Sequence, residues 1–170
     1  MDILIVDIKG KFAHFRKFYT NSSSLSYSVP PRTTIAGMLA GILGYERDSY
    51  YEIFSKEQLN IAIRKLTPTR KIMQSLNYIK GDNPGKILNP KEHTQIPLEI
   101  ITSDKGRVSY RIYINHRDKN IMDKLEKRIL DKKYYYSPYL GAAPFNCTFE
   151  FVDRVQGTLM EEKEEVLIYS

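Results

Sequence analysis

The spacing of apolar residues along the chain predicts a set of short β-strands. Residues 2–9 are apolar at most positions, which is typical of a central strand buried on both faces. Residues 58–66, 107–115 and 146–155 alternate apolar with polar side chains, which is typical of strands with one buried face. We expect residues 165–170 to add a last short strand.

Two further segments carry apolar residues at the three- and four-residue intervals of an amphipathic helix. The first covers residues 33–44, and Thr33 or Thr34 is expected to cap it. The second covers residues 118–133, with Asp118 as its expected N-cap. The predicted buried faces consist of Ile35, Met38, Leu39 and Ile42 in the first helix and Ile121, Met122, Leu125 and Ile129 in the second.

The first predicted helix contains three glycines. Gly37 and Gly41 each cost roughly 1 kcal/mol of helix propensity relative to alanine. We therefore expect another backbone, of protein or RNA, to approach the side of the helix that carries Gly37, Gly41 and Gly44. The preceding Pro30–Pro31 pair fixes a turn, and the helix N-terminus behind it is suited to hold a phosphate.

The elements follow the order strand, helix, strand, strand, helix, strand, which is the ferredoxin-like or RRM-like arrangement of an α+β fold. Two helices are then expected to cover one face of an antiparallel sheet in a single domain, residues 1–170. Residues 67–106 are longer than a simple hairpin turn requires. Strand-like residues 72–79 and 93–101 flank residues 80–86, whose composition is that of a turn, so we predict an inserted, thumb-like β-hairpin.

The charge is distributed unevenly along the chain. The total is +6, but residues 150–170 carry two basic and six acidic side chains, a net charge of −4, which leaves +10 for residues 1–149. A body this basic favours a polyanionic partner, either nucleic acid or an anionic membrane, although a solvated basic surface gives the same count. The 13 tyrosines, beside 7 phenylalanines and no tryptophan, suit binding surfaces as well as cores.

Several functional classes lack their sequence signals. The single cysteine, Cys147, excludes an internal disulfide and a cysteine-rich zinc site. The three histidines are scattered, and no phosphate loop, dinucleotide fingerprint or nucleophile elbow occurs, so we expect no metal and no cofactor. We expect a cytoplasmic protein without a membrane partner, because the N-terminus does not resemble a signal peptide and the longest apolar run, residues 35–45, is too short to span a bilayer.

Residues 9–34 interleave basic, aromatic and hydroxyl side chains. Cations neutralise phosphates, aromatic rings stack on unpaired bases, and hydroxyls contact sugar and phosphate oxygens. The residues of this segment that we expect to contact single-stranded RNA on these grounds are Arg16, Lys17, Tyr19 and Arg32. Phe12, Phe15 and Phe18 recur at three-residue spacing, and we expect them to pack in the core instead.

Two other groups of residues each have two interpretations. Residues 134–136, three consecutive tyrosines, could stack on bases, but packing beneath the last strand is the safer interpretation. Tyr19, Lys91 and His93 could form a triad for metal-independent RNA cleavage. Such a reaction needs a base for the 2′-hydroxyl and a cation for the developing phosphorane charge. The sequence alone does not show that these three residues meet.

The run FAHFRKFYTNSSSLSYSVPPRTTIAGMLAGILG, residues 12–44, resembles the N-terminal signature of a family of CRISPR-associated proteins. This is the fifth Cas family, subunits of type I Cascade complexes within the RAMP superfamily. Residues 93–115 and 136–145 are also similar to it. The matching elements are Phe15-Arg16, Ser26-Tyr27, Pro30-Pro31 with Thr33 or Thr34, and the helix with Gly37, Ala40 and Gly44. The resemblance implies a ferredoxin-like core with a projecting β thumb.

The resemblance also implies a function. The chain is then expected to be a non-catalytic RNA-binding subunit that holds the 5′ handle of the CRISPR RNA (crRNA), caps the backbone filament in antiviral defence, and meets target DNA indirectly. The implied protein partners are the backbone-forming and large subunits of Cascade. Residues 95–99 and 110–114 are most similar to the type I-B branch. The residues that we expect to bind RNA are His14, Arg16, Lys17, Tyr19, Ser26, Tyr27, Arg32, Thr33, Thr34, Arg70, Lys71, Lys91 and His93.

Two alternatives stay open at this point. In the type I-C branch, the same subunit is itself a metal-independent endoribonuclease that processes CRISPR repeat RNA. A basic domain that binds a membrane surface or another protein is a third hypothesis, and it has no family resemblance behind it.

Overall fold

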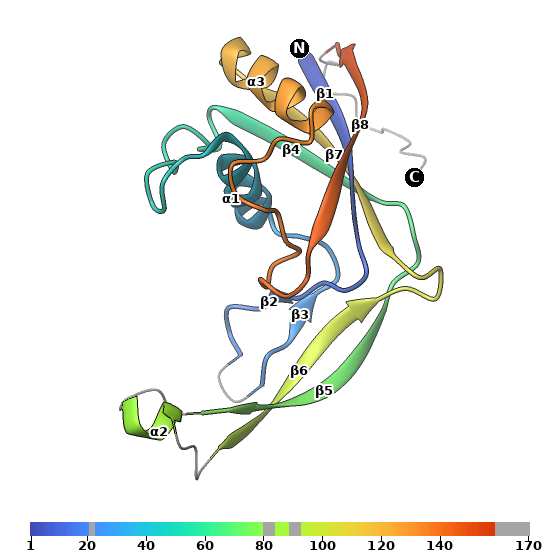
Figure 1. Cartoon of the computed structure of the whole chain (residues 1–170). Coiled ribbons are helices and arrows are strands. Elements are labelled where there is room, and N and C mark those ends of the chain that lie inside the picture. Colours follow the sequence, from blue (N-terminus) through green and yellow to red (C-terminus); the bar gives the residue numbers. More distant parts are fainter. Residues whose placement is uncertain (21–22, 80–83, 89–92, 159–170) are drawn as a thin grey trace.

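The computed structural model describes residues 1–20, 23–79, 84–88 and 93–158, which are mostly strand with two longer helices (Figure 1). The strands are β1 (Asp2–Gly10), β2 (Phe15–Arg16), β3 (Ser26–Tyr27), β4 (Leu59–Lys65), β5 (Arg70–Tyr78), β6 (Thr94–Thr102), β7 (Val108–His116) and β8 (Cys147–Gln156). The helices are α1 (Arg32–Leu43), α2 (Pro84–Leu88) and α3 (Lys119–Leu130). The expected α+β class is confirmed. The strand predicted over residues 165–170 lies outside the described residues.

The main sheet has four antiparallel strands in the order β4-β7-β1-β8. β1 is therefore a central strand, as predicted, but only one of its faces is deeply buried. Leu4, Val6 and Ile8 are fully buried. On the other face the carboxylate of Asp7 accepts a hydrogen bond from Nε of Arg111 in β7, at 2.8 Å. The prediction of two apolar faces is therefore right only in part, because the outer face carries this ion pair beside the half-buried Ile3 and Ile5.

Helices α1 and α3 lie on one side of the sheet and share its core (Figure 1). Both predicted helical faces are confirmed, since all of their residues are buried, namely Ile35, Met38, Leu39, Ile42, Ile121, Met122, Leu125 and Ile129. Tyr110 of β7 is also fully buried, and its hydroxyl donates to the carbonyl oxygen of Ser28 at 3.0 Å. Burial raises the pKa of Tyr110, so this hydroxyl stays protonated and keeps its hydrogen bond.

The two ends of α1 differ from the prediction. Pro31 occupies the N-cap position without a side-chain hydrogen bond, so the expectation that Thr33 or Thr34 caps the helix is wrong. Both threonines lie inside the first turn. Gly44 ends the helix at a φ of 88°, a left-handed conformation that glycine adopts without strain. Asp118 does cap α3, because its carboxylate accepts the backbone N–H two residues further on at 2.8 Å.

A backbone approaches the C-terminal end of α1, but the groups nearest Gly37, Gly41 and Gly44 are the side chains of Tyr50, Tyr136 and Tyr135, so the predicted backbone approach along the glycine side is confirmed only at the helix end. The N–H of Tyr135 donates to the carbonyl oxygen of Ile42 at 3.2 Å, and the N–H of Tyr136 donates to that of Gly41 at 3.1 Å. The approaching backbone belongs to the loop between α3 and β8. This loop therefore satisfies carbonyl groups that the end of a helix would otherwise leave open.

Strands β5 and β6 form a separate two-stranded antiparallel ribbon that extends away from the main sheet (Figure 1). Both strands predicted between residues 67 and 106 are present, and residues 84–88 form the short helix α2 where a turn was predicted. The β5–β6 ribbon is joined at its base to the segment before α1. Ala13 and Ile101 exchange backbone hydrogen bonds of 3.0 and 2.8 Å, and the N–H of Ser24 donates to Pro97 at 2.7 Å.

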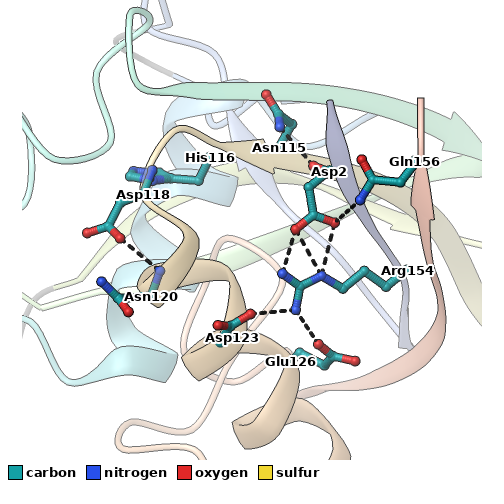
Figure 2. A network of polar contacts seen from close by, with 9 residues as sticks. All are labelled: Asp2, Asn115, His116, Asp118, Asn120, Asp123, Glu126, Arg154 and Gln156. Atoms are coloured by element: carbon teal, nitrogen blue, oxygen red, sulfur yellow. Dashed lines mark hydrogen bonds and ion pairs between the residues drawn. The ribbon is translucent and has the colours of Figure 1, made fainter. Parts of the chain in front are cut away.

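Arg154 of β8 joins the edge of the sheet to α3 (Figure 2). Its guanidinium donates to Asp123 at 2.7 Å and to Glu126 at 2.6 Å, and it also contacts both carboxylate oxygens of Asp2. The hydrogen bonds from Arg154 lower the pKa of Asp2, and the three carboxylates raise the pKa of Arg154. The acidic side of α3 is therefore held against the sheet edge by one shared cation.

Candidate nucleic-acid interface

Buried hydrogen bonds fix the segment that contains β2 and β3 against the β5–β6 ribbon. Nδ1 of His14 lies 2.8 Å from the carbonyl oxygen of Glu99, and its Nε2 lies 3.1 Å from Oγ of Ser24. Ser26 is fully buried, and its Oγ accepts the N–H of Phe15 at 2.8 Å. Because both side chains are buried and bonded inside the protein, this geometry does not support the predicted contacts of His14 and Ser26 with RNA.

The Glu99 carboxylate joins three strands. It accepts the backbone N–H of Ser26 at 2.8 Å and Nζ of Lys71 at 2.9 Å. Burial alone pushes the pKa of Glu99 upward, but these two donors outweigh burial, so the pKa lies below its ordinary value. Nζ of Lys71 also donates to the carbonyl oxygen of Ser26 at 2.7 Å, which ties β5 to β3. The Lys71 side chain keeps 34% of its surface exposed and lines the base of the ribbon.

A tight turn follows β2 and projects two aromatic rings outward. Oγ1 of the buried Thr20 donates to the carbonyl oxygen of Lys17 at 2.9 Å, and Nη2 of Arg16 donates to that of Thr20 at 3.2 Å. Between these bonds, Phe18 is 88% exposed and Tyr19 is 59% exposed. Their ring centroids lie 5.3 Å apart, edge to face. We call this surface, made of Arg16, Lys17, Phe18 and Tyr19, the 16–19 turn.

The ammonium group of Lys17 lies between two aromatic rings. Its Nζ is 5.6 Å from the ring centroid of Tyr19 and 5.8 Å from that of Tyr27. Interaction with the Tyr19 hydroxyl raises the pKa of Lys17, so the side chain stays charged across the physiological range. Tyr27 is half-buried and packs on the core, which fixes one of the two rings. The turn therefore presents a positive charge beside aromatic faces.

The phenylalanines of this segment do not share one environment. Phe15 is 2% exposed and lies in the core, as predicted. Phe12 is half-buried, with its ring centroid 6.1 Å from that of Phe145. The prediction that Phe18 packs in the core is wrong, because the segment is a strand and a turn, and a three-residue spacing lines up side chains only on a helix. The charged pair Arg16-Lys17 directly before Phe18 is the signal that could have identified it as exposed.

Arg32, at the first position of α1, is bound to the protein itself. Its Nη2 lies 3.0 Å from the carbonyl oxygen of Phe54, 2.7 Å from that of Ser55 and 2.8 Å from that of Leu59. These contacts fasten the start of α1 to the segment that leads into β4. The predicted contact between Arg32 and RNA therefore has no support in this geometry, and the phosphate seat at the helix N-terminus stays a prediction.

Thr33 and Thr34 line a different surface, a groove of about 520 Å³ between α1 and the loop before β8. No residue of the 16–19 turn lines this groove. The prediction that all three tyrosines of residues 134–136 pack in the protein is right only for Tyr134, whose hydroxyl donates to the carbonyl oxygen of Phe149 at 3.2 Å. Tyr135 and Tyr136 are 63% and 52% exposed.

The remaining predicted residues belong to the β5–β6 ribbon. Arg70 is exposed, and its Nε donates to the carboxylate of Asp104 at 2.6 Å. His93 is exposed at the outer end of β6, and Lys91 lies outside the described residues. In the part of the chain that the structure describes, no hydrogen bond or ring contact joins Tyr19 to His93, and no group of three potential metal ligands occurs.

A family model described as CRISPR-associated protein (Cas_Cas5) matches residues 3–127, which include the 16–19 turn and the β5–β6 ribbon. The chain belongs to the Cas5 family. The resemblance noted in the sequence is thereby confirmed at the level of the family. Comparison with curated proteins gives no significant match. Among the described residues, no helix has the length and hydrophobicity needed to cross a membrane.

Solved structures of CRISPR proteins share the fold of this Cas5-family chain. A chain of a CRISPR RNA-guided surveillance complex aligns with a TM-score of 0.60 at 16% identity, over 85% of this chain and 59% of that one. A chain of the Type III-B Cmr-beta complex bound to cognate target RNA and AMPPnP aligns with a TM-score of 0.56 at 15% identity, over 95% and 66%. A Cas protein crystal structure aligns with a TM-score of 0.54 at 11% identity, over 83% and 57%. The chain thus spans about three fifths of their length.

Proposed function

We propose that this Cas5-family chain is a non-catalytic RNA-binding subunit of a type I CRISPR effector complex, active in antiviral defence in the cytoplasm. Its role is to hold the 5′ handle of crRNA and to cap one end of the backbone filament. Membership of the family and the likeness of the fold to chains of CRISPR complexes support this role. The sequence of residues 95–99 and 110–114 supports placing the chain in the type I-B branch.

The strand order supports a ferredoxin-like RAMP domain over residues 1–170. The sheet order β4-β7-β1-β8, with α1 after the first strand and α3 before the last, is the order that such a domain has. The β5–β6 ribbon is its thumb in this proposal. The proposed protein partners are the backbone-forming and large subunits of the complex, and target DNA would be met only through the assembled complex.

The observation that carries the proposal is the exposed 16–19 turn. Phe18 and Tyr19 present two ring faces to solvent, and each can stack on an unpaired base. Arg16 and Lys17, on the same turn, can neutralise the phosphates of those nucleotides. A phenylalanine that is 88% exposed has no role in packing, whereas stacking on RNA would remove its apolar surface from water.

The other predicted residues take two kinds of role in this proposal. Tyr27, Arg70, Lys71 and His93 continue the RNA-contacting surface from the turn along the ribbon. His14 and Ser26 act indirectly, by holding the turn in place through buried hydrogen bonds. We propose a non-catalytic role by analogy with the type I-B branch, whose sequence residues 95–99 and 110–114 resemble.

Binding of a repeat-derived RNA, followed over a range of salt concentrations, tests the assigned surface. Arg16→Ala should weaken binding and reduce the slope of log affinity against log salt by about 0.7, the value for one phosphate contact to a single strand. Phe18→Ala should weaken binding about fivefold or more with an unchanged slope, because stacking involves no counterion. Arg47, whose side chain is 94% exposed, provides the control Arg47→Ala, which should bind like the wild type.

Two outcomes would contradict the proposal separately. If Arg16→Ala and Phe18→Ala both bind RNA as the wild type does, the 16–19 turn is not the RNA surface. If the wild-type protein cleaves repeat RNA at a specific position in the presence of EDTA, the subunit is a metal-independent endoribonuclease instead.

A further inference from the structure

A second basic surface lies between the C-terminal ends of α1 and α3. It is a groove of about 660 Å³. Its lining residues are Leu43, Gly44, Tyr45, Lys124, Lys127, Arg128, Asp131 and Lys133. Four cations therefore face one carboxylate. Figure 1 shows α3 at the end of the molecule away from β2 and β3, so this groove is separate from the 16–19 turn.

The acidic and basic side chains of α3 have different surroundings. Asp123 and Glu126 turn toward the sheet edge, where both accept hydrogen bonds from Arg154 (Figure 2). Lys124 and Lys127 lie on the side that lines the groove. Asp123 is four residues before Lys127 and would ordinarily pair with it, but Arg154 occupies that carboxylate. Within the described residues, none of the groove cations makes a salt bridge.

The lysines of the groove are not needed to cap the helices. At the end of α1, the backbone N–H of Gly44 donates to the carbonyl oxygen of Ala40 at 2.9 Å. At the end of α3, the N–H of Lys133 donates to that of Arg128 at 3.0 Å, and Nη1 of Arg128 donates back to Lys133 at 3.3 Å. Backbone groups thus satisfy these helix ends, and only Arg128 among the cations is used in the process.

An exposed tyrosine stands at the rim of the groove. Tyr135 is 63% exposed, and its ring contacts Gly44, where a Cβ would lie 2.7 Å from Cγ of the ring. Tyr136 is next to it, with the two ring centroids 4.9 Å apart. The backbone hydrogen bonds of both residues to α1 fix their position. Cations that have no salt-bridge partner among the described residues, with the exposed ring of Tyr135 at the edge of the groove, form the combination that binds single-stranded nucleic acid.

We infer that the groove between α1 and α3 is a binding site for the backbone of a single-stranded nucleic acid, separate from the strand held at the 16–19 turn. Lys124, Lys127 and Lys133 would neutralise successive phosphates, and Tyr135 would stack on one base. This goes beyond the proposed function, which needs one RNA site only. The phosphate and base chemistry is shared by DNA and RNA, so the two are separated by experiment.

The test compares fluorescent oligo-dT and oligo-U of equal length. The groove variant carries Lys124→Gln, Lys127→Gln and Lys133→Gln, whereas Arg128 is kept because it is bonded to the backbone. Its affinity should fall about tenfold at about 0.1 M salt, and its salt slope should fall by about 2, since each phosphate contact to a single strand contributes about 0.7. A larger loss with oligo-dT identifies DNA as the ligand, and a larger loss with oligo-U identifies RNA.

A variant of equal charge is the control for a purely general effect of charge. It carries Lys56→Gln, Lys105→Gln and Lys119→Gln, three exposed lysines that do not line the groove. This variant should keep most of the wild-type affinity. If it loses as much affinity as the groove variant, or if the groove variant binds as the wild type does, the inference is overturned. Circular dichroism of each variant shows whether it is folded.

Two further measurements separate this site from other ligands. Tyr135→Ala should weaken oligo-dT binding and leave an abasic strand of the same length unaffected. If poly-glutamate displaces the strand at equal charge and Tyr135→Ala has no effect, the groove binds an acidic protein segment and the inference is wrong. Repeating the groove measurement in the Arg16→Ala background separates the contributions of the two sites to binding. The groove effect should persist there even if the 16–19 turn proves not to bind RNA.

Discussion

Replacing Arg32 with methionine separates a structural arginine from an RNA-binding one. Methionine keeps an unbranched apolar chain but removes every donor. Nη2 of Arg32 lies within 3.0 Å of three carbonyl oxygens, yet this nitrogen carries only two hydrogens. The arrangement therefore amounts to two hydrogen bonds, one of them shared between two acceptors, and the substitution removes both.

The expected loss of stability follows from those two bonds. A hydrogen bond from a charged donor contributes about 1.5–3 kcal/mol when buried. Because Arg32 is half-buried, water replaces part of the loss, and we expect Arg32→Met to lower the free energy of unfolding by about 2–4 kcal/mol. In a chain of this size, that corresponds to a fall in melting temperature of about 4–16 °C.

Thermal unfolding followed by circular dichroism measures this loss. Arg47→Met is the matched control, because its side chain is 94% exposed and its one ion pair, with Asp48, spans 3.5 Å. We expect the control to stay within about 0.5 kcal/mol of the wild type. Folded Arg32→Met, assayed below its melting temperature, should bind RNA with wild-type affinity. The structural role of Arg32 is refuted if Arg32→Met has the melting temperature of the wild type, or if the folded variant loses RNA binding.

Three other outcomes follow from the structure. Gly141→Ala should destabilise the protein more than Gly106→Ala. Both glycines have a φ near +82°, which costs alanine roughly 1–2 kcal/mol. Of these two positions, only at Gly141 would a Cβ overlap a backbone oxygen. Near neutral pH, Arg154→Met should lower the melting temperature by an amount that does not change with pH. Because Arg154 depresses the pKa of Asp2 below its ordinary 3.8, that difference should narrow as the pH falls below about 4. Burial raises the pKa of Cys147 to about 12. Iodoacetamide should therefore label Cys147 slowly at about pH 8 in the folded protein and rapidly in guanidinium chloride. Rapid labelling of the folded protein would contradict that burial.

The regular elements could be predicted because each carries its own periodic signal. In β7, the alternate residues Val108, Tyr110, Ile112 and Ile114 are all fully buried, as the pattern requires. Asp118 identifies the start of α3 because an N-cap bond closes over two residues. In both cases the relevant partner lies within a few residues or follows from a simple repeat, so the local sequence is sufficient to predict the element.

The candidate site could be predicted only in part, because the role of a cation depends on partners that are distant in sequence. Arg16 and Arg32 look equivalent as sequence, but the acceptors of Arg32 lie 22 to 27 residues further along the chain. Likewise the backbone N–H of Ser26 donates to the carboxylate of Glu99, 73 residues away. The position of Phe18 depends on local structure, since a three-residue spacing favours the core only in a helix and this segment is a turn. Exposure at a turn of this kind is decided by the backbone path.

The seam between the β5–β6 ribbon and the segment before α1 makes the two regions thermodynamically linked. The pairing of Ala13 with Ile101 and the bonds from His14 to Glu99 and Ser24 oblige the ribbon and the 16–19 turn to move together. Under the proposed function, a protein bound to the ribbon would therefore lower the conformational entropy that RNA would have to remove on binding the turn. Such coupling would be reciprocal, so bound RNA would strengthen protein binding at the ribbon by the same factor. The order in which RNA and protein arrive then changes the rate of assembly but not its final stability.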